Sequence, residues 1–140
     1  MNLAPVITRL SLLCPSLIAV EAVTGLNDID RDEYPVAGVH PLDDIASLSD
    51  VVGCIRQEIV GQFGVLIAAR AMDPASGIDP LDDARQEIAA ALLGYRHVAW
   101  RGPITYVRGD IVAIDASRTL WRDTYRAESL WTAHITEIDA

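Results

Sequence analysis

Lysine is absent from this sequence, so all eleven basic side chains are arginine. Twenty acids outnumber them, which gives a net charge of −9 and disfavours general binding to nucleic-acid phosphates. Residues 1–93 hold fourteen acids and five arginines, whereas residues 94–140 hold six of each. An acidic body with a more basic end suits head-to-tail contact between identical subunits, in which unlike surfaces meet. On charge alone, an ordinary solvated acidic surface is an equal alternative.

Long apolar runs are also missing. No stretch approaches the roughly 20 apolar residues that a membrane helix requires. The N-terminal MNLAPVITRLSLLCP carries its one basic residue, Arg9, in the middle, so it lacks the basic-then-apolar order of a signal peptide. A hydrophobic content of 51% argues against disorder, and 140 residues suit one domain. We therefore expect a single domain over residues 1–140, made in the cytosol.

Motifs that carry chemistry are scarce. Cys14 and Cys54 form no CxxC pair, and the isolated His40, His97 and His134 have no zinc-ligand spacing. The sequence holds no GxSxG, HExxH, P-loop or GxGxxG pattern. We expect buried thiols, no metal, no cofactor and no enzyme activity. A catalytic triad built from distant positions stays open.

The clearest element is a helix in DPLDDARQEIAAALLG, residues 79–94. Asp79 is a good N-cap, and Gly94 lies where a left-handed C-terminal residue belongs. Asp82 and Asp83 complement the positive end of the helix dipole. They are not expected to share a metal ion or proton, because adjacent helical residues point about 100° apart.

The strongest strand is CIRQEIVGQFGVLIAAR, residues 54–70, in which Ile55, Ile59, Phe63, Val65 and Ile67 alternate onto one face. Its glycines, at positions 61 and 64, suggest a bulge or bend.

The remaining elements follow from shorter patterns. We expect a helix over 3–13, a strand in YPVAGVHP, an exposed loop over 42–53 and a hairpin in ITYVRGDIVAID with its turn at Gly109-Asp110. Residues 17–26 fit a strand or a helix. The predicted class is therefore α+β, a mostly antiparallel (mixed) sheet with two or more helices packed on one face.

The stretch TLWRDTYRAESLW, residues 119–131, continues the arginine pattern that begins at Arg118. Arg118, Arg122 and Arg126 recur every fourth residue, so on a strand they share one face. The opposite face then holds the apolar side chains Trp121, Tyr125, Ala127 and Trp131, with Asp123 as the exception. We expect the aromatic side to be core. The arginine side is either plainly solvated or meets the acidic loops of a neighbouring subunit.

The order and local patterns of these elements resemble the tail terminator (tail completion) proteins of tailed bacteriophages. The likeness is carried by YPVAGVHPLDD, IRQEIVGQFGVLIAAR, the helix that ends in ALLGY, and VRGDIVAID leading to TLWRDTYRAE. It covers most of residues 34–131, while residues 15–33 match poorly. The family has no short invariant motif that could be carried over residue by residue.

The resemblance implies a structural virion protein of the tail or neck, assembled in the host cytoplasm. It implies a homo-oligomeric ring, most simply a hexamer, that caps the tail tube, ends tube polymerisation and offers a surface to head–tail connector or stopper proteins. DNA would pass through the lumen without specific binding, and no membrane would be involved. Candidate contacts with the tube or a neighbouring subunit are Asp43, Asp44, Asp50, Arg70, Asp73, Arg118, Arg122 and Arg126.

Two other readings stay open: a different head–tail joining or stopper protein, or a small acidic protein that inhibits a host factor.

Overall fold

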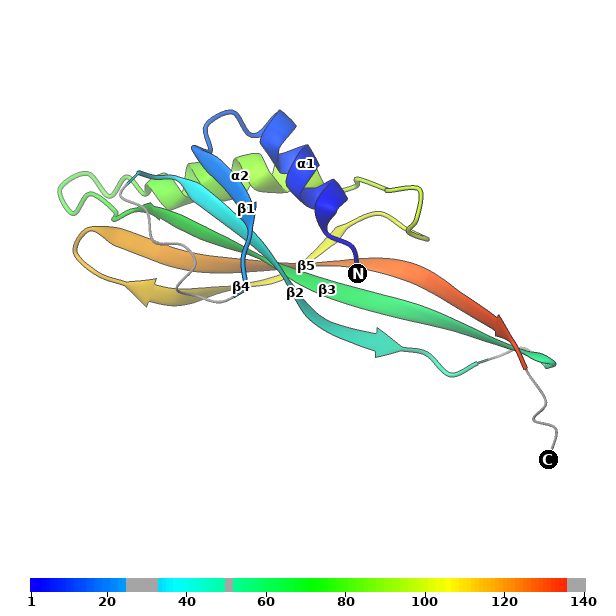
Figure 1. The fold of residues 1–140 in the computed structure, drawn as a ribbon. Helices are drawn as coiled ribbons and strands as arrows, with labels where there is room; N and C mark the ends of the chain where they lie inside the picture. The colour runs from blue at the N-terminus through cyan, green and yellow to red at the C-terminus, as the bar shows by residue number, and fades with distance from the viewer. Residues whose placement is uncertain (25–32, 50–51, 136–140) are drawn as a thin grey trace.

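The computed structural model describes residues 1–24, 33–49 and 52–135, which form five strands and two helices (Figure 1). The elements are, in chain order, α1 (Ala4–Leu13), β1 (Ala19–Ala22), β2 (Val36–Ala46), β3 (Cys54–Arg70), α2 (Pro80–Leu92), β4 (Thr105–Ile114) and β5 (Arg118–His134). The strands lie in the order β1-β2-β3-β5-β4. β1 runs parallel to β2 and the other neighbours are antiparallel, so the predicted α+β class with a mixed sheet is confirmed.

Helix α2 begins and ends where its sequence predicts. The side chain of Asp79 accepts a hydrogen bond from the backbone N–H of Leu81 at 3.1 Å, and Gly94 has a φ of 81°. The apolar stripe is buried; it consists of Leu81, Ala84, Ile88, Ala91 and Leu92. Neither this helix nor any other in the described part of the chain is long and apolar enough to cross a membrane.

The main core joins the helices to one face of the sheet, which we call the helix face. β3 contributes Phe63, Val65 and Ile67, as its alternation predicts, and α1 contributes Val6 and Leu10. Tyr125 of β5 is fully buried here, and its ring stacks on that of Phe63 with centroids 5.8 Å apart. α2 packs against β3, and α1 contacts both α2 and β1.

The opposite face of the sheet, which we call the far face, carries a smaller buried cluster. Its members are Val23, Val36, Leu66, Ala68 and Leu120, in positions that alternate with those of the main core. Part of the sheet is therefore apolar on both faces, which explains why Leu66 and Ala68 interrupt the polar alternation of β3.

Asp123 is buried on the helix face and completes a polar cluster there. Its carboxylate accepts two hydrogen bonds from Arg85 of α2, at 2.9 and 3.0 Å. It also accepts one from the Tyr106 hydroxyl at 3.0 Å and one from Trp121 Nε1 at 2.8 Å. The Arg85 guanidinium lies 4.7 Å from the centre of the Trp121 ring. Asp123, the one acid among the core-facing residues of β5, is thus a buried charge whose hydrogen-bonding capacity is satisfied.

The predicted hairpin at Gly109-Asp110 is wrong, because β4 runs through these residues as one strand. The chain turns later, at Asp115, whose side chain accepts hydrogen bonds from the backbone N–H groups of Ser117 and Arg118. Gly109 serves another purpose. A Cβ there would lie 2.7 Å from the side chain of Asp123, so the glycine makes room for the buried carboxylate.

The predicted loop over 42–53 is also partly wrong, since β2 extends to Ala46. After Val39, β2 has no strand paired along its outer edge in the described part of the chain. Charged residues such as Asp43 and Asp44 are usual on an unpaired edge. The irregularity expected in β3 lies instead in β2, where the register shifts between Pro41 and Asp44. Residues 17–26 contain β1, and residues 25–26 lie outside the described part.

Candidate functional site

The two central strands are much longer than the helices that cover them. β3 and β5 each have 17 residues, about 56 Å at strand spacing, whereas α2 has 13 residues, about 20 Å. Figure 1 shows one end of β3 and β5 reaching well past both helices. We call this overhang the ribbon: residues 54–58 of β3 paired with residues 130–134 of β5.

Within the described residues, only two strands pair in the ribbon. The pairing of β2 with β3 ends at Ala46 and Ile59, and the pairing of β4 with β5 ends at Thr105 and Arg126. A two-stranded segment without a covering layer is only marginally stable in water. No other described segment therefore gives the ribbon the packing that supports the rest of the sheet.

Apolar side chains lie on both faces of the ribbon. Ile55 and Trp131 project on the helix face and are 42% and 63% exposed. Leu130 projects on the far face and is 41% exposed. Large apolar side chains grouped on a protruding element are typical of a contact surface, and tryptophan is enriched at the centres of such contacts.

One edge of the ribbon is open. The outer edge of β5 receives its last backbone hydrogen bond at Glu128, whose carbonyl accepts from Arg101 N–H at 2.7 Å. Past that point, no backbone hydrogen bond to this edge is found within the described residues. On the β3 side, Ser47 and Ser49 bond to the backbone of Glu58 and Arg56. An open edge beside apolar side chains can accept a strand from another chain.

The base of the ribbon is braced by the segment between α2 and β4. Arg101 forms an ion pair with Glu58, and Trp100 is buried beside it. A hollow of about 170 Å³ at this base is lined partly by Asp44, Trp100 and Trp131. Because both members of the ion pair are exposed, it contributes at most about 1 kcal/mol.

The predicted contact residues do not come together in one place. Asp43 and Asp44 lie exposed on β2, and Asp44 reaches the ribbon base. Arg70 and Arg118 face each other at the opposite end of the sheet. Close to that end, Asp73 accepts hydrogen bonds from Ala75 N–H and the Ser76 hydroxyl, which lower the pKa of its carboxyl. Asp50 lies outside the described residues.

Arg122 and Arg126 of β5 each donate a side-chain hydrogen bond to a residue of another strand. Arg122 is half-buried on the far face, where its Nε donates to Nε2 of His40 at 3.2 Å. Arg126 is exposed, and its Nε donates to the Thr105 hydroxyl at 3.1 Å. Trp121 and Tyr125 lie on the helix face, as predicted. The prediction that Trp131 is core is wrong, because the covering helices end before the sheet reaches it.

The contact between His40 and Arg122 predicts an acid-sensitive contribution to stability. Burial lowers the pKa of His40 below its usual 6.5, and the charge of Arg122 acts in the same direction, against a raising effect of the Pro41 carbonyl. As the pH drops below 6.5, His40 therefore binds a proton in the unfolded chain before it does so in the folded chain. The free energy of unfolding should fall as the pH drops below 6.5, and the effect should level off below the folded-state pKa.

Urea unfolding over a pH series, for the wild type and His40→Gln, measures this contribution. The glutamine can still accept a hydrogen bond from Arg122 but cannot be protonated. The difference in unfolding free energy between the two proteins should depend on pH only in the window below 6.5. Parallel curves through that window would show that His40 titrates alike in both states.

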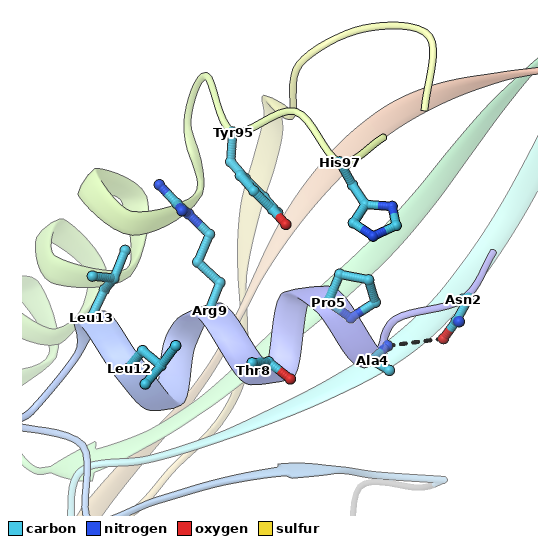
Figure 2. A pocket seen from close by; sticks show the side chains of 9 residues that line it. All are labelled: Asn2, Ala4, Pro5, Thr8, Arg9, Leu12, Leu13, Tyr95 and His97. Atoms are coloured by element: carbon cyan, nitrogen blue, oxygen red, sulfur yellow. Dashed lines mark hydrogen bonds between the residues drawn. The ribbon is translucent and has the colours of Figure 1, made fainter. Parts of the chain in front are cut away.

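Another hollow, with a volume of about 510 Å³, lies along α1 (Figure 2). Its walls include Arg9 of α1 together with Tyr95 and His97 from the segment after α2. The Arg9 guanidinium lies 4.2 Å from the centre of the Tyr95 ring, and its Nε donates to the carbonyl of Ala91 in the last turn of α2. No carboxylate is among the lining residues. Arg9 thus connects α1 to the end of α2 and to the segment that follows it.

Sequence patterns missed Ile55, Leu130 and Trp131 as contact residues. Periodicity assigns residues to a face of a strand but not to a covered or uncovered part of it. The available signal was length: a 17-residue strand cannot be covered end to end by a 13-residue helix.

Comparison with known proteins identifies the family. The family model described as "Phage tail terminator protein" matches residues 1–133. Among curated proteins, none matches the chain. One similar solved chain belongs to the structure "Virion of native gene transfer agent (GTA) particle"; it is 18% identical, with 86% of this chain and 82% of that chain covered and a TM-score of 0.48. The family match spans nearly the whole sequence, and the protein therefore belongs to the phage tail terminator family, a family of structural proteins of the phage tail.

Proposed function

We propose that the protein forms a ring of identical subunits, most simply a hexamer, on the end of the tail tube. The whole chain acts as one tail-terminator domain. The ring ends tube polymerisation and offers its outer surface to the head–tail joining proteins, without catalysis and without a cofactor. Family membership supports the tail as its place of action. The net charge of −9 is compatible with DNA passing through the ring without adhering.

The exposed ribbon is the observation that supports the proposed contact between subunits. It has apolar side chains on both faces and an open strand edge, so a single surface of another subunit would cover only part of it. Seating the ribbon between neighbours would bury Ile55, Leu130 and Trp131 and would supply the layer that a two-stranded segment lacks. We propose that the far face of the sheet contributes further contacts.

The charged candidates fit a head-to-tail arrangement. Asp43 and Asp44 lie toward the ribbon end of the sheet, whereas Arg70, Asp73 and Arg118 lie toward the other end. In a ring, the ribbon end of one subunit meets a different surface of the next, as unlike surfaces must when the contact is heterologous. We include Asp50, Arg122 and Arg126 in the same set of subunit or tube contacts.

Tail lengths test the proposed role. Particles assembled without this protein should have overlong tails that lack heads, because nothing ends tube growth or prepares the tube for joining. Electron microscopy of such particles, with and without the protein restored, gives the length distribution. Tails of normal length that merely lack heads would assign the protein to the joining step instead. Normal tails with heads attached would contradict both roles.

A further inference from the structure

A second hollow, of about 430 Å³, lies on the far face of the sheet, away from the main core. Apolar side chains make most of its wall: Val23, Pro41, Leu42 and Leu66. His40 and Arg122 supply polar groups. We call it the Arg122 hollow.

Arg122 is held in place by a neutral partner. Its Nε donates to Nε2 of His40 at 3.2 Å, and Nδ1 of His40 lies 3.2 Å from the carbonyl oxygen of Pro41. A single tautomer satisfies both contacts: Nδ1 carries the proton and donates, while Nε2 accepts. The His40 ring packs directly against the backbone of Gly64, where an added Cβ would lie only 2.4 Å from it. This close packing holds the imidazole in place. The guanidinium is thereby oriented but not neutralised.

No carboxylate of the described residues forms an ion pair with Arg122. The acid directly across the strand pair is Asp110, and its ion-pair partner is Arg108, at 3.7 Å. Arg122 is half-buried, and taking a charge out of water is unfavourable unless an opposite charge compensates it. Among the described residues, Arg122 is therefore a half-buried cation beside an apolar hollow with no carboxylate to compensate it, and an anion from outside would complete the site.

The chemistry of the hollow selects the kind of anion. A guanidinium offers a planar pair of donors that fits a carboxylate, and the apolar wall fits an aliphatic stem. Each copy of this chain carries twenty acids against eleven arginines, so carboxylates are plentiful on its neighbours in any assembly. We propose that the Arg122 hollow binds a carboxylate side chain presented by a neighbouring copy of the chain. This inference deepens the proposed ring and rests on it.

Hexanoate is a suitable probe, since it joins a carboxylate to an aliphatic stem. Titrated into the protein at neutral pH, it should cause saturable NMR shifts of the Arg122 Nε–H and the His40 ring. Hexanol has a similar stem without the charge and should bind at least about tenfold more weakly, as should hexanoate to Arg122→Gln. Arg126→Gln is the matched control on the same face and should bind hexanoate normally. No saturable shift, or equal responses to hexanoate and hexanol, would overturn the inference.

Sedimentation of the same samples identifies the source of the carboxylate. Hexanoate and Arg122→Gln should each weaken self-association, whereas Arg108→Gln, at an exposed arginine outside the proposed contact set, should have a much smaller effect. If hexanoate binds but self-association is unchanged, the neighbouring copy is ruled out as the source. If the wild type forms no ring even on its tube, the proposed ring fails and the neighbouring copy fails with it. The hexanoate titration still decides in that case whether the hollow binds carboxylates.

Discussion

Replacing Asp123 with alanine is expected to destabilise the folded protein by about 3 kcal/mol. The substitution leaves the Arg85 guanidinium without its counterion and removes the acceptor for the Tyr106 hydroxyl and the Trp121 indole. We take the lower end of the range for a broken buried ion pair, because the Arg85 side chain is 31% exposed and water can partly solvate it. Urea unfolding followed by tryptophan fluorescence measures the change.

Two further variants test whether the loss of stability comes from the unpaired charge of Arg85. Asp110→Ala removes an exposed carboxylate two residues along β4 from Arg108 and should change stability by no more than about 0.5 kcal/mol. The double variant Arg85→Met with Asp123→Leu should recover much of the lost stability, since apolar pairs often replace buried ion pairs at little cost. A loss below about 1 kcal/mol for Asp123→Ala would mean that the cluster is hydrated and does not support the fold.

Replacing Trp131 with aspartate is expected to abolish ring formation while leaving the subunit folded. Trp131 is 63% exposed in the single chain, so its loss should change the free energy of unfolding by less than about 1 kcal/mol. In the proposed ring the same side chain is buried between subunits. Losing a central tryptophan there should cost at least about 2 kcal/mol per contact, roughly thirtyfold in affinity, and the effect repeats at each contact of the ring. Native mass measurements on rings recovered from tube ends follow this change.

Ile111→Asp is the matched control for this variant. Ile111 is also an exposed apolar residue on a strand, 54% exposed on β4, and it pairs with Trp121 in the middle of the sheet, away from both proposed contact ends. It should assemble like the wild type. If Ile111→Asp prevents assembly and Trp131→Asp does not, the edge formed by β4 is the contact and the ribbon is not.

Local patterns predicted much of the fold because they act over short distances. The cap at Asp79, the stripe of α2 and the alternation of β3 each depend on neighbours within a few residues. Gly109 shows where this logic fails. Between two apolar runs, a glycine followed by aspartate favours a turn. Here the close approach of the Asp123 carboxylate, fourteen positions away in sequence, requires the glycine instead.

The candidate contact surface was harder to predict for a related reason. Trp131 and Tyr125 occupy the same face of the same strand, and nothing in their local sequence separates a core aromatic from an exposed one. What separates them is the distance along β5 at which the covering layer ends. Likewise, Arg122 and Arg126 share a face, but only Arg122 lies opposite Leu66 and beside His40. These differences arise from tertiary packing.

Imaging of tail tube ends tests the central claim most directly. Tubes assembled with the wild-type protein should end in a ring of identical subunits, in which the ribbon of each subunit lies buried between its neighbours. Tubes assembled with Trp131→Asp should lack the ring and continue to grow. A ring in which Ile55, Leu130 and Trp131 all face solvent would contradict the assigned contact. Bare tube ends in the presence of the wild-type protein would contradict the capping role itself.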